Sequence, residues 1–419
     1  MIAEILSTGD EIRTGALVDT NSAYISQKLE EIGVEVRRHS CVGDDLNMLV
    51  DVFREIGHRA DVAIVTGGLG PTTDDLTAEA AARATGVDLA VDPEALASMT
   101  EFFKSRNRPL TDTNKKQALL PRGAEWMLNR AGTAPGFSFK IGRCVLFCMP
   151  GVPREMRIMM EEVVIPRITA LQGADRMLYR LKTLGAFGIG ESDVGRLLEG
   201  FPERFPDLKL GFRAHFPEVQ VKLYAQGHDE RLLHAELEAA AKWVLDRIGK
   251  WTFSLNGDPM EKEIGRLLTA RNATLAVAES CTGGLIAHRL TTVPGSSDYF
   301  LFSGVTYSNE AKMQVLGVAA DTIQKFGAVH EETAREMADG ARRISGAVYG
   351  LSTTGIAGPA GGTDEKPVGT VCIGLSTAKE TYAFRFHYYY NSRDMHKEMF
   401  AMKAMDVLRR ELIGIGAKG

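Results

Sequence analysis

Residues 61–75 read DVAIVTGGLGPTTDD, an apolar run that passes directly into a glycine-rich turn. A short, continuous apolar run predicts a strand buried on both faces, as in a parallel sheet covered by helices. Strand patterns at 2–6 and 34–42 alternate with helical apolar spacing at 25, 29 and 32. The first part of the chain therefore predicts an α/β fold, whose ligands gather at the carboxyl ends of the strands.

The organisation changes twice along the 419 residues, a length that suits about two or three domains. Strand-like runs mix with two helical patterns from 173 to 255, which indicates a small α+β unit. A turn-rich stretch at Asn256–Pro259 follows, and strand–helix alternation then resumes. We expect domains at 1–170, 171–254 and 255–419.

The composition is that of a soluble globular protein, with 44% hydrophobic and 25% charged residues. The net charge of −5 provides no basic field for nucleic acid or anionic lipid, and no apolar run approaches the ~18–20 residues that span a bilayer. The five cysteines are scattered and odd in number, which argues against a disulfide framework. We expect a cytoplasmic protein with no membrane and no nucleic acid partner.

The stretch AESCTGG at 278–284 follows an apolar run and precedes a helical one. Ser280 then sits where a strand enters a helix, and the unpaired backbone N–H groups of a helix N-terminus suit an oxyanion or a phosphate. Gly283 and Gly284 allow the backbone to approach a ligand closely. A helix cap is the alternative role for Ser280, and Cys281 is either a rival nucleophile or a buried thiol.

The stretch TYSNEAK at 306–312 contains residue types that can activate a serine nucleophile. A lysine removed from water has a lowered pKa and can act as a base, and a tyrosine can relay a proton. Ser280, Tyr307 and Lys312 together would suffice for acyl transfer from an amide. An ordinary strand tyrosine and a solvated helix lysine are the alternatives.

A third segment reads TTGIAGP at 353–359 and continues as GGTDEKPVGT at 361–370. Hydroxyls and glycines at a strand end can place donors around a phosphate or a ribose. Arg393 opens the last helical pattern, within NSRD at 391–394, and can clamp a phosphate.

In this order and spacing, the three segments resemble the nicotinamide mononucleotide amidohydrolase (PncC) family. The whole chain, including TGGLGPTTDD at 66–75, resembles the competence/damage-inducible CinA family, which carries such a domain at its C-terminus. The resemblance implies hydrolysis of nicotinamide mononucleotide to nicotinate mononucleotide and ammonia, without a cofactor. Ser280 is the implied nucleophile, Lys312 its base and Tyr307 a helper.

The resemblance also points to the residues around the substrate. The N–H groups near Thr282 and Gly283 are expected to hold the oxyanion. The segment YYYNS at 388–392, just before Arg393, departs from the glycine-containing form of the family. The substrate-binding candidates are Thr282, Gly283, Gly284, Ser297, Thr354, Gly355 and Arg393.

Three acidic clusters end the first three strand patterns, at 8–11, 43–45 and 72–75. In a parallel sheet all three fall on one edge, where carboxylates can hold Mg²⁺ together with water and phosphate. The glycines of 67–70 allow a phosphate to approach. Capping of helix starts is the alternative role for these acids.

This part of the chain resembles the molybdopterin-binding fold of molybdenum-cofactor biosynthesis proteins. In the CinA family that resemblance implies a three-layer domain that cleaves ADP-ribose with a divalent ion, Mg²⁺, Mn²⁺ or Co²⁺. The candidate metal ligands are Asp10, Asp44, Asp74 and Asp75, and the candidate nucleotide contacts are Asn21, Gly67, Gly68, Gly70, Thr72 and Thr73.

The middle part resembles the KH-type domain of the CinA family and contains GAFG at 185–188. Gly-x-x-Gly commonly marks only a turn, and 12 basic against 12 acidic residues in 173–255 argue against RNA. We expect a connector or dimerisation role, in the homodimer that the family implies. The alternative for the whole chain is a nucleotide- or pterin-binding scaffold that acts in competence or DNA repair without turnover.

Overall fold

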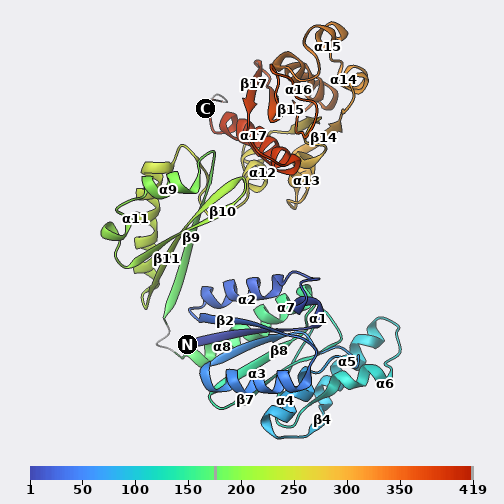
Figure 1. Ribbon diagram of the computed structural model, residues 1–419, viewed down its shortest axis with the longest axis vertical. Coiled ribbons are helices and arrows are strands. Elements are labelled where there is room, and N and C mark those ends of the chain that lie inside the picture. The colour runs from blue at the N-terminus through green and yellow to red at the C-terminus, as the bar shows by residue number, and fades with distance from the viewer. Residues whose placement is uncertain (174–176, 417–419) are drawn as a thin grey trace. The chain divides into compact units, whose positions relative to one another are not determined.

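The computed structural model describes residues 1–173 and 177–416 (Figure 1). The chain divides into two compact units. One unit comprises Met1–Leu181 and Ala225–Ala235, and the other comprises Lys182–Tyr224 and Glu236–Gly419.

The N-terminal domain is built on a six-stranded sheet with the order β2-β1-β3-β8-β7-β6. Its strands are β1 (Ile2–Thr8), β2 (Glu35–Val42), β3 (Val62–Thr66), β6 (Glu125–Met127), β7 (Gly136–Ile141) and β8 (Cys144–Met149). The pairs β1–β2, β1–β3 and β3–β8 are parallel, and β7 runs antiparallel to β6 and β8. Every residue of β3 is buried, as its continuous apolar sequence predicts.

Helices cover both faces of this sheet. They are α1 (Asp10–Arg13), α2 (Thr20–Glu31), α3 (Leu46–Arg59), α4 (Thr77–Thr85), α5 (Pro93–Ser105), α6 (Asp112–Lys115), α7 (Pro153–Met159) and α8 (Ile165–Gln172), with a small β4 (Leu89–Val91) and β5 (Leu119–Pro121) ladder and short η1 (Lys116–Ala118) and η2 (Met160–Val164) turns. Ile64 packs with Ile25 of α2 on one face, whereas Val65 packs with Phe53 of α3 on the other. The three-layer prediction is confirmed.

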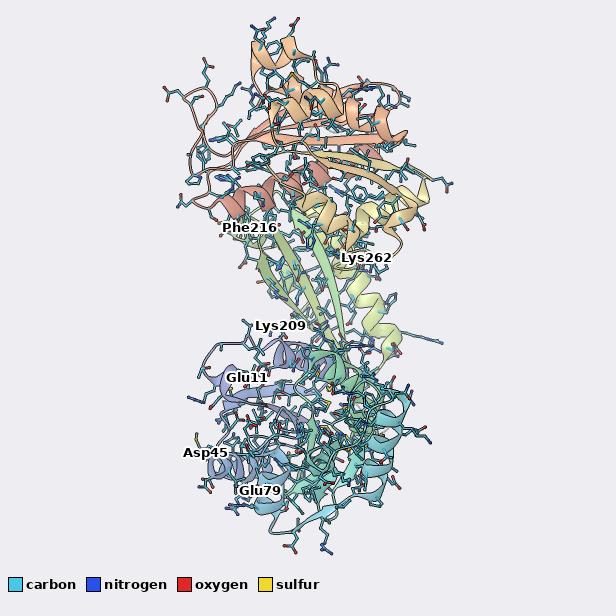
Figure 2. All side chains as sticks on the ribbon, turned by 90° about the vertical axis from the view of Figure 1, so that its right-hand side faces the viewer. Glu11, Asp45, Glu79, Lys209, Phe216 and Lys262 are labelled. Atoms are coloured by element: carbon cyan, nitrogen blue, oxygen red, sulfur yellow. The ribbon has the colours of Figure 1, made fainter. Side chains whose placement is uncertain are left out.

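The middle domain has a four-stranded sheet with the order β10-β11-β9-β12. Its elements are β9 (Leu178–Phe187), α9 (Glu191–Leu197), α10 (Phe201–Arg204), β10 (Leu208–His215), β11 (Glu218–Gly227), α11 (Glu230–Ile248) and β12 (Thr252–Ser254). Phe216, labelled in Figure 2, lies in the β10–β11 turn, and its ring stands edge-on to Tyr390 at 5.0 Å. The α+β prediction for this segment is confirmed.

The C-terminal domain has a five-stranded sheet with the order β14-β13-β15-β16-β17. Its strands are β13 (Leu275–Glu279), β14 (Phe300–Val305), β15 (Tyr349–Gly355), β16 (Thr370–Ser376) and β17 (Thr381–His387), and its helices are α12 (Met260–Ala270), α13 (Leu285–Thr291), η3 (Ser296–Asp298), α14 (Asn309–Leu316), α15 (Ala320–Phe326), α16 (Glu331–Ser345) and α17 (Arg393–Leu412). Val277 packs with residues of α12 and α17, and Ala278 packs with residues of α16 on the opposite face.

The strand register decides what meets at the site. β13 pairs in parallel with β14 and β15, and Glu279 lies opposite both Val305 and Thr353. The segments that follow these three strands therefore leave the same edge of the sheet. Among the described helices, none is both long and apolar enough to cross a lipid bilayer.

Candidate active sites

Ser280 is the first residue after β13, and its backbone N–H donates to the Thr353 carbonyl at 3.0 Å. This bond extends the β13–β15 ladder by one step and fixes the residue at the sheet edge. The residue is 8% exposed and therefore buried.

Lys312 faces Ser280 from α14, the helix that Ser308 caps by accepting from the Ala311 N–H. Its side chain is fully buried, and Nζ lies 3.1 Å from Ser280 Oγ. Nζ also donates to the carbonyls of Thr306 at 2.9 Å and Tyr307 at 3.2 Å. No carboxylate in the described part of the chain pairs with it, and burial lowers the pKa of Lys312.

The two carbonyls match the needs of an uncharged amine. A neutral lysine has two N–H groups and one lone pair, and the carbonyls of Thr306 and Tyr307 take both N–H groups. Nζ also donates to Ser280 Oγ, so once the ammonium gives up that proton its lone pair faces the Ser280 hydroxyl. The arrangement therefore suits a serine nucleophile with a lysine base.

The turn after Ser280 is held by Glu279, a residue that the sequence pattern did not single out. Its carboxylate is fully buried and accepts from the N–H groups of Gly284 at 3.0 Å, Ile286 at 3.1 Å and Ala287 at 2.9 Å. It also accepts from Thr282 Oγ1 at 2.7 Å. The amino end of α13 is therefore occupied by this carboxylate.

Few donors of the turn remain for a substrate. Gly283 N–H donates to the Ser280 carbonyl at 3.1 Å, and the Thr282 hydroxyl is buried between Glu279 and Thr353. Within the described ranges, the N–H groups of Cys281 and Thr282 donate to no other residue. These two groups, rather than that of Gly283, are the donors that can receive an oxyanion.

Cys281 is a buried thiol. Burial raises its pKa to about 12, so the sulfur carries no thiolate character near neutral pH. A Cβ on Gly355 would lie 3.2 Å from its Sγ, which shows that the thiol packs against the third segment. The buried-thiol interpretation of Cys281 is confirmed.

Tyr307 and Arg393 contact each other near the candidate C-terminal site. Arg393 Nη2 donates to the Tyr307 hydroxyl at 2.9 Å, and Nη1 donates to the Gly358 carbonyl at 2.6 Å. The Tyr307 side chain is 60% exposed. Across the described residues, no hydrogen bond joins its hydroxyl to Ser280 or Lys312, so Tyr307 supports the lysine through its backbone carbonyl.

Thr354 and Ser297 do not reach this centre. The Thr354 hydroxyl is buried and donates to the Ala328 carbonyl at 2.7 Å. Ser297 is exposed in η3, before the amino end of β14, whereas Ser280 follows the carboxyl end of β13. Because β13 and β14 are parallel, Ser280 and Ser297 lie at opposite ends of this strand pair. The five residues of β13 span about 16 Å, which separates the two side chains within one chain.

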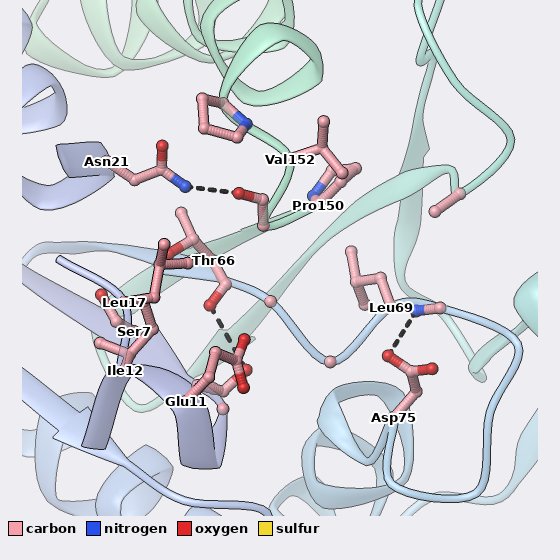
Figure 3. Close-up of a pocket in the computed structure, with 18 of the residues that line it drawn as sticks. Ser7, Glu11, Ile12, Leu17, Asn21, Thr66, Leu69, Asp75, Pro150 and Val152 are labelled. Carbon is pink, nitrogen blue, oxygen red and sulfur yellow. Dashed lines mark hydrogen bonds between the residues drawn. The ribbon is translucent and has the colours of Figure 1, made fainter. Parts of the chain in front are cut away.

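The N-terminal domain contains a cavity of about 880 Å³ at the carboxyl edge of its parallel strands (Figure 3). The sequence predicts this edge of the sheet. The neighbouring strands β1, β2 and β3 end there at Thr8, Val42 and Thr66. Residues 67–70 form one wall, and a Cβ on Gly67 would lie 2.5 Å from the Thr8 carbonyl. The lining includes the candidates Asn21, Asp44, Gly67, Gly68, Gly70, Asp74 and Asp75.

Asp75 holds the glycine-rich loop. Its carboxylate accepts from the Gly70 N–H at 2.7 Å, a bond that Figure 3 shows next to Leu69. It also accepts from the Thr72 N–H at 2.8 Å and from the Thr72 hydroxyl. Both oxygens are therefore engaged by the protein. Thr72 and Thr73 are exposed residues of the same loop, outside the cavity lining.

Asp44 and Asp74 line the cavity at this acidic edge, whereas the predicted ligand Asp10 lies outside the lining. Asp44 Oδ2 accepts from the Asp10 N–H at 3.1 Å, and Asp10 Oδ1 pairs with Arg13 at 2.9 Å. Burial, together with the charges of Asp10, Glu11 and Asp74, raises the pKa of Asp44. Among the described residues, no three acidic, imidazole or thiol groups stand close enough together to hold a metal ion by themselves, so any ion here would need water or phosphate as further ligands.

Two buried amides line the same cavity. Asn21 Nδ2 donates to the Gly151 carbonyl at 2.7 Å, and Gln117 Nε2 donates to the Leu69 carbonyl at 3.1 Å. The amide oxygens of both have no partner in the described part of the chain. Gln117 was not identified from the sequence, because nothing in its local pattern relates it to a loop 48 residues earlier.

Comparison with known proteins covers all three domains. The chain matches the probable molybdopterin binding domain over residues 4–170, the damage-inducible protein CinA KH domain over 181–254 and the CinA C-terminal domain over 257–412. A solved structure of CinA from Thermoplasma acidophilum is 35% identical to it, with a TM-score of 0.37, and covers 40% of this chain and 97% of its own.

Relatives also match this chain over nearly its whole length. A CinA-like protein of Desulfosudis oleivorans is 52% identical over 99% of this chain and 100% of its own length. A CinA-like protein of Geobacter metallireducens is 44% identical over 99% and 100%. A putative competence-damage inducible protein of Clostridium novyi is 40% identical over 100% of both. The chain therefore belongs to the CinA family.

Proposed function

We propose that the C-terminal domain hydrolyses the carboxamide of nicotinamide mononucleotide to give nicotinate mononucleotide and ammonia. The observation that carries this proposal is the 3.1 Å contact between Ser280 Oγ and the fully buried Lys312 Nζ. A buried lysine with a lowered pKa and no carboxylate partner among the described residues is the base that a serine amidase needs.

The proposed chemistry begins with neutral Lys312. As Ser280 Oγ bonds to the carboxamide carbon, its proton passes to Lys312 Nζ. The N–H groups of Cys281 and Thr282 stabilise the tetrahedral oxyanion. The Lys312 ammonium then protonates the nitrogen as the C–N bond breaks, and ammonia leaves.

The acyl-serine ester is removed by reversing the proton path. Water attacks the ester carbon while Lys312 accepts its proton, and the same proton returns to Ser280 Oγ as the C–O bond breaks. Tyr307 contributes the carbonyl that orients Lys312 Nζ. Each proton that moves is therefore held at a named atom of this chain.

Ammonia release distinguishes this proposal from a scaffold that binds without turnover. Purified full-length protein is incubated with nicotinamide mononucleotide, ammonia is measured by a coupled assay, and nicotinate mononucleotide is identified by mass spectrometry. Stoichiometric formation of both products supports the deamidase. Binding of the mononucleotide with no ammonia would support the scaffold.

We also propose that the N-terminal domain cleaves the pyrophosphate of ADP-ribose to AMP and ribose 5-phosphate. The 880 Å³ cavity, lined by Asp44 and Asp74 with Asp10 beside Asp44, favours this second activity. A divalent ion held by these carboxylates would neutralise pyrophosphate charge. The loop of Gly67–Gly70 lets backbone approach the phosphates, and the Asn21 amide oxygen is available to a ligand donor.

The second proposal is tested by chromatography of the products. ADP-ribose is incubated with the protein and Mg²⁺, Mn²⁺ or Co²⁺, with a chelator as the control. Metal-dependent formation of AMP supports the proposal. Cleavage that resists the chelator, or no cleavage with any of these ions, would leave this domain as a binding module.

A further inference from the structure

Lys397 is a cation of the C-terminal site that the motif comparison did not single out. It lies on α17, four residues after Arg393, so the two side chains project from one face of the helix. Arg393 already donates to the Gly358 carbonyl and to the Tyr307 hydroxyl. Among the described residues, Lys397 has neither a carboxylate partner nor a hydrogen-bond acceptor.

The ammonium of Lys397 lies over the turn that carries Ser280. A Cβ built on Gly283 would lie 3.9 Å from Lys397 Nζ, and Lys397 is the nearest group to that position. Gly283 N–H donates to the Ser280 carbonyl at 3.1 Å, so Lys397 lies beside the tight turn that begins at Ser280. Lys397 is half-buried, which distinguishes it from a freely solvated lysine.

The neighbouring acidic residue does not neutralise this cation. Glu398 is directed to Arg289, whose Nη1 lies 3.8 Å from Glu398 Oε2. Arg289 is also held by Glu261 at 2.7 Å and by Glu218 at 3.4 Å. Glu218, Glu261 and Glu398 are thus gathered around Arg289, and no carboxylate of the described residues forms an ion pair with Lys397.

We propose that Lys397 binds the phosphate monoester of the substrate and makes the site select a mononucleotide over the corresponding nucleoside. This inference rests on the proposed deamidase function. The half-buried ammonium of Lys397 has no ion-pair partner among the described residues, and a phosphate dianion can accept a charge-assisted hydrogen bond from it. Because Arg393 is engaged by Gly358 and Tyr307, it shapes the site, and Lys397 supplies the phosphate contact.

The experiment measures steady-state ammonia release by the full-length protein with nicotinamide mononucleotide and with nicotinamide riboside. The variants are Lys397→Met, which keeps the aliphatic stem, and Lys397→Arg, which keeps the charge. Lys379→Met is the matched control, because Lys379 is exposed in the β16–β17 turn. In Lys397→Met we expect KM for the mononucleotide to rise about 10- to 100-fold with kcat little changed. Lys397→Arg is expected to retain most of the affinity, and the riboside parameters and the control are expected to stay at wild-type values.

Calorimetric binding separates this inference from the proposed function. Nicotinamide mononucleotide is titrated into Ser280→Ala and into Ser280→Ala/Lys397→Met, neither of which needs to turn it over. A loss of affinity only in the double variant supports the phosphate contact, even if the wild type releases no ammonia and the deamidase proposal fails. Equal affinity in both proteins, or an equal loss for the riboside, would overturn the assignment of Lys397.

Discussion

Lys312 Nζ lies 3.1 Å from Ser280 Oγ although the two residues are 32 positions apart in the chain. The contact exists because parallel pairing of β13 with β14 brings the ends of both strands to one edge. Ser280 follows β13 directly, and Lys312 lies one helical turn into α14, which follows β14. A small shift of either strand would therefore separate the nucleophile from its base.

Replacing Ser280 by alanine should abolish ammonia release from nicotinamide mononucleotide. Loss of a nucleophile reduces kcat by on the order of 10³-fold or more, while substrate binding remains. The measurement is ammonia release at saturating substrate, with binding followed by calorimetry. Cys281→Ala is the control and should keep most of the activity, because the thiol is buried and protonated. Recovery of a covalent adduct on Cys281 by mass spectrometry would contradict the assignment.

Replacing Lys312 by arginine should remove activity although it preserves the positive charge. A guanidinium does not give up its proton near neutral pH, so it cannot accept the proton of Ser280. Circular dichroism and calorimetric binding of the mononucleotide show whether the variant is folded and competent to bind. Near-wild-type turnover in Lys312→Arg would show that the lysine acts only through its charge.

The pH dependence follows from the direction of the Lys312 shift. Burial lowers its pKa, so the neutral base is present at lower pH than for a solvated lysine. We expect kcat to rise with pH through this lowered pKa and to level off above it. The measurement is a kcat–pH profile at saturating substrate. If the rising limb of the profile has the apparent pKa of an ordinary solvated lysine, Lys312 is not a buried neutral base.

The layers and the sheet edge of each α/β domain could be predicted from sequence, because they depend on local pattern. The apolar run 61–65 predicted a buried strand, and residues 62–66 form β3 with every residue buried. The position of Ser280 between a strand and a helix was also predicted, and the structure places it directly after β13. Such features can be predicted from apolar periodicity and from the positions of glycines, because they depend on neighbouring residues in the sequence and not on distant ones.

Contacts between distant segments could not be predicted in this way. Glu279 reads as an ordinary polar residue at a strand end, yet it is fully buried and accepts from four donors. Ser297 precedes its strand and therefore lies at the opposite edge from Ser280, which the motif order did not reveal. The Arg393–Tyr307 bond joins residues 86 positions apart. Each depends on topology and register rather than on local composition.

Replacing Glu279 by glutamine should destabilise the C-terminal domain and reduce deamidation. The amide keeps one acceptor oxygen, but its NH₂ group faces N–H groups that now lack a partner. This should lower the free energy of unfolding by about 2–4 kcal/mol. Urea unfolding measures the loss in the free energy of unfolding. The ammonia assay measures how much the disordered turn reduces deamidation. Glu310→Gln is the control, because Glu310 is an exposed glutamate in the first turn of α14. It should change stability by less than about 1 kcal/mol, and an equal effect of both changes would refute the role of Glu279.

Replacing Asp44 and Asp75 should affect ADP-ribose cleavage in different ways. Asp44→Asn removes a charge from the acidic edge, so more divalent ion should be needed for half-maximal cleavage, and excess ion should restore part of the rate. Asp75→Asn loosens the loop that Asp75 holds through Gly70 and Thr72, and excess ion should not restore it. Metal titrations of AMP formation measure both. Asp45→Asn is the control, because Asp45 caps α3 and asparagine caps equally well. Ser280→Ala should leave this activity intact, and rescue of Asp75→Asn by metal would contradict its structural role.

Glu218 should make the stability of its unit depend on pH. It lies 3.4 Å from Arg289 Nη2, and burial, together with the charge of Glu261, raises the pKa of Glu218 to about 7. A raised pKa means that the folded state holds the proton more tightly than the unfolded chain. The contribution therefore favours folding at low pH and is lost as pH rises from the ordinary glutamate value through about 7.

The test compares wild type with Glu218→Gln, which cannot titrate. Between about pH 5 and about pH 8, the wild type should lose about 2–3 kcal/mol relative to the variant. Urea unfolding is followed by Trp243 and Trp251 fluorescence in a Trp126→Phe background, so that the signal comes from the unit containing Glu218. Glu199→Gln, at an exposed glutamate of the same unit, should track the wild type at both pH values. A stability difference between wild type and Glu218→Gln that stays constant across this range would show that Glu218 remains ionised beside Arg289 in the folded protein.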